Sequence, residues 1–204
     1  MMSDNFDLLV SGGLVYLPNQ KIEEQDIGIK DSKIIAIGNL KSKKFKKKID
    51  VKNLLVFPGA IDSQVHFREP GLTYKEDISC GTKGAVLGGI TSIFEMPNTK
   101  PSTTNKEALG VKLKIAEKNA FCNYSFFIGA AKENIKNLNE LELLDGCCGV
   151  KIFMGSSTGD LLVEDDESLK QILNNVNRRV AVHSEDEYRL RERKKILNIK
   201  DVDV

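Results

Sequence analysis

The sequence lacks most of the features that would assign it to a special class of protein. Its formal net charge is only +1, so no overall charge favours binding to nucleic acid or a membrane surface. No apolar run approaches the roughly 20 residues of a membrane-spanning helix, and the first residues, MMSDNFDLLV, lack the basic start of a signal peptide. The cysteines have no C-x-x-C spacing, which argues against a zinc knuckle and favours buried thiols in a reducing compartment. We therefore expect a cytoplasmic protein with no nucleic-acid or membrane partner.

One local run of charge stands out from this balance. Residues 41–48 read KSKKFKKK. The run could bind a polyanion, or it could be a solvated connection whose lysines discourage pairing at a strand edge. Acidic residues elsewhere cancel its charge, so we favour the solvated connection. Absent or salt-insensitive binding to DNA and RNA would exclude the polyanion site.

The chain divides into two parts by its pattern of apolar residues. Residues 1–56 contain short apolar runs around turn residues, which predict hairpins at residues 6–17 and 26–38 in a small β-rich segment. Residues 57–204 alternate apolar strands with helices, which predicts a parallel sheet buried on both faces. The expected strands are residues 54–67, 91–96, 123–130, 149–155 and 179–184, and the expected helices are residues 74–87, 105–119, 134–144, 165–175 and 185–195.

Two parallel folds are open to such a chain. A doubly wound nucleotide-binding sheet needs a glycine-rich turn after its first strand, and neither Gly88-Gly89 nor residues 155–159 have that spacing. A (β/α)8 barrel instead gathers its active residues at the carboxyl ends of several strands. Polar candidates stand at or near such strand ends, at His66, Asn98, Lys151 and His183. This pattern favours the barrel, of which the chain would supply about five βα units.

The stretch FPGAIDSQVHFREPG at residues 57–71 concentrates polar side chains where the first strand ends. Asp62, Gln64, His66 and Arg68 are two residues apart, so an extended strand would point them to one side. The chain has only two histidines, His66 and His183. A histidine at a strand end is either a hydrogen-bonded structural residue or a metal ligand, and its position here leaves both open.

Lys151 lies in the apolar run Val150–Met154, where an unpaired ammonium group would be costly. It could reach the rim of the sheet or pair with an acid. Alternatively it could be a desolvated, neutral amine that forms a Schiff base, acts as a general base or forms a carbamate with CO2. A carbamate is an anionic oxygen ligand for metal ions, and the two histidines favour this choice.

Four stretches in the expected order together resemble the dihydroorotases, in the cyclic amidohydrolase branch that includes allantoinases and dihydropyrimidinases. They are PGAIDSQVHFREPG at 58–71, MPNT at 96–99, VKIFMGSSTG at 150–159 and VHSED at 182–186. The resemblance implies a (β/α)8 barrel with a small β-sandwich built from both chain ends, to which residues 1–56 would contribute. It also implies reversible hydrolysis of dihydroorotate to N-carbamoyl aspartate in pyrimidine biosynthesis.

The resemblance further implies a role for each matching residue. His66 would be a metal ligand, Lys151 the bridge carboxylated by CO2, and His183 a ligand of the second metal ion, with one or two zinc ions bound. Arg68 and Asn98 would hold the substrate carboxylate, since a guanidinium group offers two parallel donors. Hydantoins and dihydropyrimidines have no such carboxylate. The alternative for Arg68 is a surface ion pair with Glu69 or Glu76.

The sequence departs from the family pattern in two respects. Gln64 stands where the family has the first histidine of His-x-His, and an amide oxygen is a poorer zinc ligand than imidazole. We expect one weak metal position as a result. The remaining ligand histidine and the general-base aspartate would lie beyond Val204, so we expect the N-terminal portion of a longer protein, or a split or decayed gene product.

Three functional hypotheses follow from these features. The first is a zinc-dependent hydrolase of dihydroorotate, a small-molecule substrate. The second is a non-catalytic dihydroorotase-like scaffold for a partner such as aspartate carbamoyltransferase, and the third is another cyclic amidohydrolase of the allantoinase or dihydropyrimidinase type. Open strand edges with apolar faces would also favour a homo-oligomer.

Overall fold

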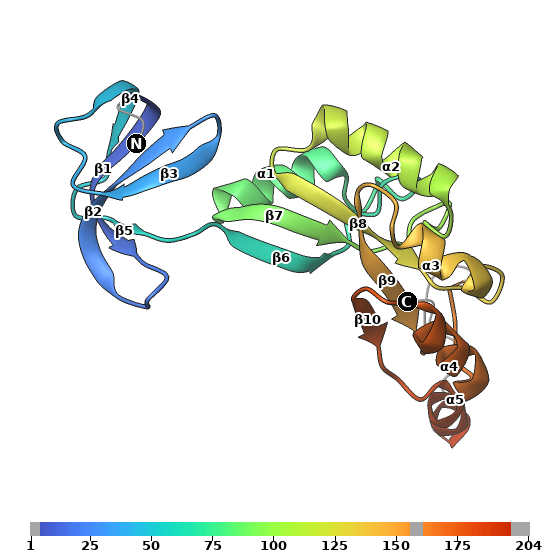
Figure 1. Cartoon of the computed structure of the whole chain (residues 1–204). Helices are drawn as coiled ribbons and strands as arrows, with labels where there is room; N and C mark the ends of the chain where they lie inside the picture. The colour runs from blue at the N-terminus through green and yellow to red at the C-terminus, as the bar shows by residue number, and fades with distance from the viewer. Residues whose placement is uncertain (1–4, 156–160, 197–204) are drawn as a thin grey trace. The chain divides into compact units, whose positions relative to one another are not determined.

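The computed structural model describes residues 5–155 and 161–196. The chain divides into two compact units, Met1–Pro58 and Gly59–Val204 (Figure 1). Within the described residues no helix is long and apolar enough to cross a membrane.

The first unit is a mixed sheet with the strand order β3-β2-β1-β4, to which β5 adds by pairing with β1. Its strands are β1 (Asn5–Tyr16), β2 (Ile22–Lys30), β3 (Lys33–Gly38), β4 (Lys44–Asp50) and β5 (Leu55–Val56). The hairpin predicted at residues 26–38 is confirmed, because β2 and β3 are antiparallel. Asp31 and Ser32 connect them with φ angles of 49° and 60°, the left-handed conformations that a tight hairpin turn needs.

The hairpin predicted at residues 6–17 is wrong, because β1 continues through the glycines as one strand. The pairing of β1 with β2 shifts register between Val10 and Gly13. Asp26 Oδ1 accepts hydrogen bonds from Ser11 Oγ at 2.7 Å and from the Gly12 amide at 3.0 Å. A β-bulge of this kind bends a strand without reversing it, and the Asp26 carboxylate is hydrogen-bonded to the residues of the bulge.

The lysine run also differs from the expected solvated connection. Residues 44–50 form β4, which pairs with β1 in parallel. All seven of its residues are exposed, and Lys46 forms a 2.8 Å ion pair with Asp7. The lysines are therefore the solvated side chains of an edge strand, and that position fits their expected role of discouraging further pairing.

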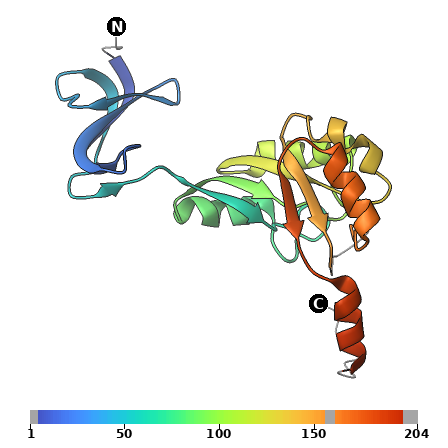
Figure 2. The same ribbon diagram turned by 60° about the horizontal axis from the view of Figure 1, so that its bottom comes forward.

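The second unit is a five-stranded parallel sheet with the sequential order β10-β9-β8-β7-β6. Its strands are β6 (Ala60–Val65), β7 (Ile90–Glu95), β8 (Asn123–Gly129), β9 (Cys147–Phe153) and β10 (Val180–His183). Its helices are α1 (Ile78–Leu87), α2 (Lys106–Asn119), the 3-10 turn η1 (Ile135–Asn137), α3 (Leu138–Leu141), α4 (Asp166–Asn175) and α5 (Glu187–Ile196). Right-handed crossovers between strands in sequential order put the connecting helices on one face of a sheet, and the two views in Figures 1 and 2 agree with this.

The first predicted strand of this sheet, residues 54–67, is in fact broken. Residues 57–59 have no strand structure and separate β5, in the first unit, from β6, in the second. Pro58 has no amide hydrogen to donate. A side chain at Gly59 would meet Thr91 at 2.1 Å, so only glycine allows the backbone to approach β7 here.

Two helix starts follow from capping side chains. The predicted N-cap Asn105 is confirmed, because its Oδ1 accepts a 2.8 Å hydrogen bond from the Ala108 amide. The first helix begins at Ile78 and not at Tyr74, since Asp77 is extended and its Oδ1 accepts from the Cys80 amide at 2.6 Å. An aspartate in this position starts a helix by satisfying an otherwise unpaired amide.

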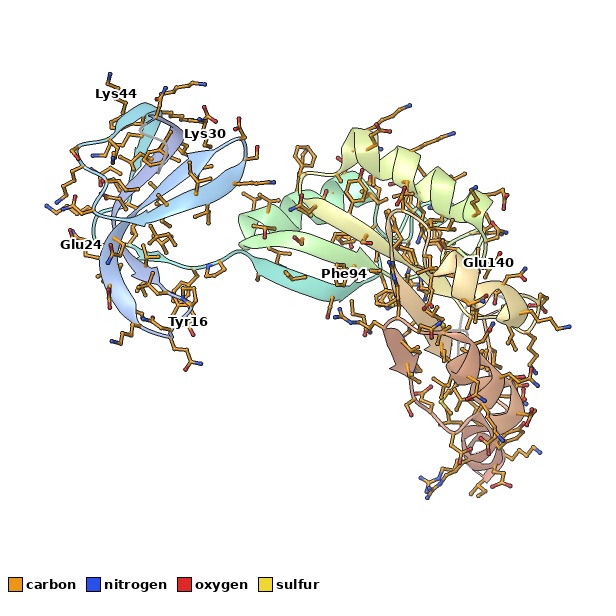
Figure 3. All side chains as sticks on the ribbon, in the orientation of Figure 1. Tyr16, Glu24, Lys30, Lys44, Phe94 and Glu140 are labelled. Atoms are coloured by element: carbon orange, nitrogen blue, oxygen red, sulfur yellow. The ribbon has the colours of Figure 1, made fainter. Side chains whose placement is uncertain are left out.

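The core lies between the sheet and its helices. Alternate residues of β8 and β9 are buried there against Leu109 and Ala116 of α2 and against Ile172 of α4; these strand residues are Phe126, Ile128, Val150 and Ile152. Side chains of the intervening strand residues point to the opposite, helix-free face. Phe94, labelled in Figure 3, lies on the side of the sheet away from α2 and packs edge-on against Phe127 with 6.4 Å between ring centroids.

Candidate active site

The carboxyl ends of β6 and β7 bring His66 and Asn98 together. His66 follows the last residue of β6 and Asn98 lies in the loop after β7. Their atoms Nδ1 and Oδ1 are 2.8 Å apart. An amide oxygen can only accept, so the imidazole donates from Nδ1, and its Nε2 keeps the lone pair that a metal ion requires.

Arg68 completes this first group, although not as a member of a straight strand. Its Nη1 donates a 3.1 Å hydrogen bond to the backbone oxygen of Asn98. Strand β6 ends at Val65 after a register shift, and Arg68 has a φ angle of 64°. The predicted alternating row from residue 62 to residue 68 is therefore wrong beyond residue 65, because the chain turns there.

The surface ion pair considered for Arg68 is not found among the described residues. Glu69 instead accepts a 2.9 Å hydrogen bond from the Ile78 amide through Oε2, at the start of α1. This contact occupies Glu69 and leaves Arg68 directed at Asn98.

Lys151 lies in β9 and only 2% of its surface is exposed. Within residues 5–155 and 161–196 no hydrogen bond or ion pair reaches its Nζ, which lies 5.0 Å from the centroid of the Phe153 ring. Burial lowers the pKa of the Lys151 amine. Neither of the structural roles considered for this lysine, a solvated rim position or a paired acid, is present in the described residues.

His183 lies on the same face of the sheet as Lys151. In the parallel pairing of β9 with β10, Lys151 is opposite Ala181 and Phe153 is opposite His183, and paired residues point to the same face. That face is the helix-free one, since Val150 and Ile152 point into the core. The His183 ring is 5.9 Å from the Phe153 ring, and its Nε2 is 2.9 Å from Oε2 of Glu185.

Positive groups surround His66 as well. Burial is the main cause of a lowered pKa of its imidazole, and the cations of Arg68, Lys151 and Lys112 lower that pKa further, while the Asn98 hydrogen bond opposes them. His66 is therefore neutral at physiological pH, the state in which imidazole binds metal.

Gln64, the remaining candidate ligand, is exposed. Its backbone amide donates to Asp62 Oδ1 at 3.1 Å, and no contact joins its side chain to His66, Lys151 or His183 in the described parts of the chain. Among those residues no three His, Cys, Asp or Glu side chains lie close enough to hold a metal ion. The described His, Cys, Asp and Glu side chains therefore do not form a metal site by themselves.

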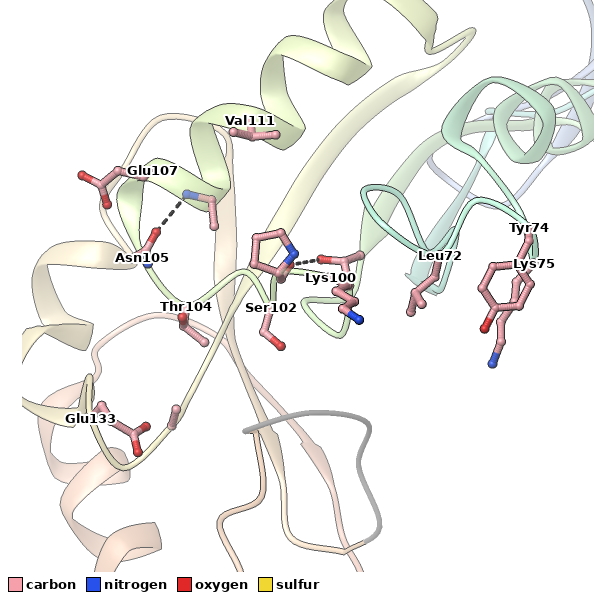
Figure 4. A pocket seen from close by; sticks show the side chains of 14 residues that line it. Leu72, Tyr74, Lys75, Lys100, Ser102, Thr104, Asn105, Glu107, Val111 and Glu133 are labelled. Atoms are coloured by element: carbon pink, nitrogen blue, oxygen red, sulfur yellow. Dashed lines mark hydrogen bonds between the residues drawn. The ribbon is translucent and has the colours of Figure 1, made fainter. Parts of the chain in front are cut away.

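A large hollow in the second unit lies away from these residues. It has a volume of about 1100 Å3 and lies between residues 72–75, residues 99–105 and the start of α2 (Figure 4). It adjoins the loop that carries Asn98, but none of the six candidate residues lines it. Its lining mixes apolar side chains such as Leu72 and Val111 with lysine, glutamate and small polar side chains.

Two buried charged residues next to the site were missed by the sequence analysis. Glu95, at the end of β7, is 1% exposed and Lys112, in α2, is fully buried; they form an ion pair. A signal was present, since Lys112 stands at helical spacing between the apolar residues Leu109 and Ala116. A cation on the apolar stripe of a helix needs a buried partner.

Known proteins resemble this chain over most of its length. A family model described as dihydro-orotase-like matches residues 53–146. A dihydroorotase of Methanosarcina mazei is 34% identical over 185 residues, which cover 89% of this chain and 40% of the relative. A dihydroorotase of Pyrococcus horikoshii is 37% identical over 182 residues, with 88% and 40% covered. The chain belongs to the dihydroorotase-like cyclic amidohydrolases.

Other relatives and solved structures of cyclic amidohydrolases agree with this assignment. An allantoinase of Rubrobacter xylanophilus is 36% identical over 186 residues, which cover 89% of this chain and 40% of the relative. L-hydantoinase from Arthrobacter aurescens superposes with a TM-score of 0.86 at 27% identity, covering 96% of this chain and 45% of that one. D-hydantoinase from a Bacillus species has a TM-score of 0.77 at 26% identity, with 94% and 42% covered.

These comparisons confirm the fold predicted for this dihydroorotase-like chain, an incomplete (β/α)8 barrel with an N-terminal β segment. The chain spans about 40% of the length of the curated relatives that it matches. The structure places the predicted site residues in two groups, which are His66 with Arg68 and Asn98, and Lys151 with His183. Gln64 belongs to neither.

Proposed function

We propose that this chain forms part of a zinc-dependent dihydroorotase, which reversibly hydrolyses dihydroorotate to N-carbamoyl aspartate in pyrimidine biosynthesis. The observation that carries the proposal is Lys151, a buried amine with no hydrogen bond or ion pair among the described residues and with His183 on the neighbouring strand. Zinc would be held by His66, His183 and a carbamate of Lys151, with Gln64 at most a weak fourth ligand.

The donor set fits a carboxylated lysine. A buried amine with a lowered pKa is partly neutral and can attack CO2. Attack by the neutral amine forms an N–C bond, turns one C=O bond of CO2 into a carboxylate C–O bond and releases one proton. Counted from the ammonium form, two protons leave and a buried cation becomes an anion. Burial causes the lowered pKa of Lys151. The carbamate anion would need a nearby cation to offset its own burial, which a bound zinc ion would supply.

Zinc in such a site supplies a Lewis acid that polarises an amide carbonyl and lowers the pKa of a bound water. The chain's own residues prepare the ligands for it. Burial keeps His66 neutral, and the hydrogen bond from its Nδ1 to Asn98 fixes the tautomer in which Nε2 can bind metal. Asn98 is therefore a positioning residue for His66 in addition to its proposed contact with substrate.

Arg68 and Asn98 favour dihydroorotate over related cyclic amides. Arg68 uses one donor for the Asn98 backbone and keeps its other guanidinium donors, while the Asn98 side chain accepts from His66 through Oδ1 and keeps its amide hydrogens. Together they present several N–H groups, which suit a carboxylate. The carboxylate of dihydroorotate is the group that distinguishes it from hydantoins and dihydropyrimidines.

The test is a comparison of ligand affinities by isothermal titration calorimetry in the presence of zinc and bicarbonate. Binding is preferred to turnover, because the chain spans about 40% of the length of the curated relatives that it matches. We expect dihydroorotate to bind at least ten times more tightly than dihydrouracil, which lacks the carboxylate, and Arg68→Met to remove the difference. Equal affinities in the wild type would favour another cyclic amidohydrolase, and failure to bind zinc would contradict the metal site.

A second candidate function is a non-catalytic scaffold. The exposed Gln64 favours it, because the position offers no good metal ligand. The edge strands β6 and β10 also expose apolar side chains, with Ile61 61% and Val182 42% exposed. The partner would be aspartate carbamoyltransferase or a second copy of the chain. Copurification with neither, together with zinc binding restored by Gln64→His, would contradict the scaffold.

A further inference from the structure

We infer that the ion pair of Glu95 and Lys112 is a positioning device for the two loops that carry Arg68 and Asn98. The inference deepens the proposed function and rests on it for the identity of the ligand. The contacts of Glu95 and Lys112 lie within the chain. Their effect on the two loops can therefore be measured without any ligand.

The pair lies deep between the sheet and α2. The side chains of Lys112 and Glu95 are 0% and 1% exposed, and Nζ of Lys112 lies 5.4 Å from the centroid of the Phe126 ring. Taking two such charges out of water costs several kcal/mol per ion. An apolar pair of similar volume would serve stability as well or better, so its stability contribution alone does not account for the pair.

The contacts of the pair lead to the two site loops. Besides Glu95, Nζ of Lys112 donates a 2.9 Å hydrogen bond to the backbone oxygen of Met96, two residues before Asn98. Burial raises the pKa of Glu95, and a backbone interaction with Arg68 is among the effects that oppose this rise. Lys112 of helix α2 thus holds Met96, the first residue of the loop after β7. Its ion-pair partner Glu95 connects the same helix to the loop after β6, which carries Arg68.

Both held loops need such support. Arg68 has a φ angle of 64°, a conformation that costs a non-glycine residue of order 1 kcal/mol or more, and an acceptor for its amide helps to fix it. From there its Nη1 reaches the Asn98 backbone oxygen, and Asn98 reaches His66. The ion pair therefore supports the two loops whose side chains, Arg68 and Asn98, would donate hydrogen bonds to a carboxylate.

The first test uses amide hydrogen exchange measured by NMR on the unliganded chain. We expect Lys112→Met to speed exchange of the Arg68 amide at least tenfold and to leave the amides of Val150 and Ile152 unchanged. Lys114→Met is the matched control, since Lys114 is an exposed residue of the same helix. Uniform acceleration over the whole second unit, or an unchanged Arg68 amide, would overturn the inference.

A second variant guards against loss of folding. The double change Glu95→Gln with Lys112→Met removes both charges and leaves no buried ion unpaired, and Gln retains an acceptor for the Arg68 amide. We expect this double variant to protect the Arg68 amide better than Lys112→Met alone. Protection no better than in the single variant would show that the Glu95 side chain does not hold the Arg68 loop.

The third measurement separates positioning from general stability. Lys112→Met should weaken dihydroorotate binding about tenfold while the affinity for dihydrouracil stays within twofold of wild type. Equal losses for both ligands would indicate a merely structural role and overturn the inference. If wild-type chain binds no dihydroorotate, the proposed function fails, and the exchange of the Arg68 amide still decides the positioning role.

Discussion

Replacing Lys151 with methionine should make the protein more stable while it removes the proposed metal site. The side chain is buried and has no hydrogen bond or ion pair with any described residue. A buried ion carries an effective penalty of several kcal/mol, part of which deprotonation relieves. Methionine has a similar length and no charge, so we expect the free energy of unfolding at pH 7 to rise by about 2 kcal/mol.

The assay is urea unfolding followed by circular dichroism, in buffer free of CO2 and zinc so that the amine stays unmodified. For a chain of this size 1 kcal/mol corresponds to about 2–4 °C in Tm, so thermal unfolding should show a rise of about 4–8 °C. Lys170→Met, at an exposed position of α4, should change the free energy by less than about 0.5 kcal/mol.

The pH dependence gives the prediction a definite sign. Burial lowers the pKa of Lys151 below its ordinary 10.5, so the unfolded chain binds this proton more tightly than the folded one. Wild-type stability should therefore rise with pH between the folded pKa and 10.5, and the advantage of Lys151→Met should shrink over the same range. A variant less stable than wild type by more than about 1 kcal/mol would refute the reasoning, because it would reveal a stabilising partner of the lysine.

Three further predictions concern other parts of the second unit. Gln64→His should raise zinc affinity at least tenfold, because imidazole is the better zinc ligand, and equilibrium dialysis would show it; unchanged affinity would mean that residue 64 does not face the metal. Burial raises the pKa of Cys148 to about 12, so a thiol reagent at pH 8 should label the exposed Cys80 and spare Cys148 until the chain is unfolded. Burial raises the pKa of Glu95 to about 7 from its ordinary 4.5, so the stability it contributes is complete below pH 4.5 and is lost as the pH rises through 7. Glu95→Gln should flatten the fall of the unfolding free energy between pH 4.5 and 7, and identical pH profiles for the variant and wild type would contradict the shift.

Much of the second unit could be predicted from the sequence, because its strands are apolar enough to be buried on both faces. The alternation of strands and helices gave the parallel sheet, and Asn105 marked a helix start. The approach failed where a distant side chain decides the local structure. Residues 6–17 form one bulged strand where a hairpin was expected, and Asp26 is hydrogen-bonded to the bulge. No sequence pattern near residues 6–17 indicates this contact.

The candidate site shows the same division. Positions at strand ends identified His66, Lys151 and His183, since strand ends meet at one edge of a parallel sheet whatever the details. The turn at Arg68 and the buried pair of Glu95 with Lys112 were not predicted, because each depends on a tertiary contact between separate elements. Lys112 on an apolar helix stripe was the one local sign of that contact.

The most direct measurement is NMR of the chain labelled with 15N-lysine in buffer containing 13C-bicarbonate and zinc. If Lys151 is a metal-binding carbamate, a carbamate carbon coupled to one lysine nitrogen should appear, with zinc bound, and both should be lost in Lys151→Met. A wild-type spectrum without that carbon, or one whose signal survives the substitution, would contradict the proposed metal site.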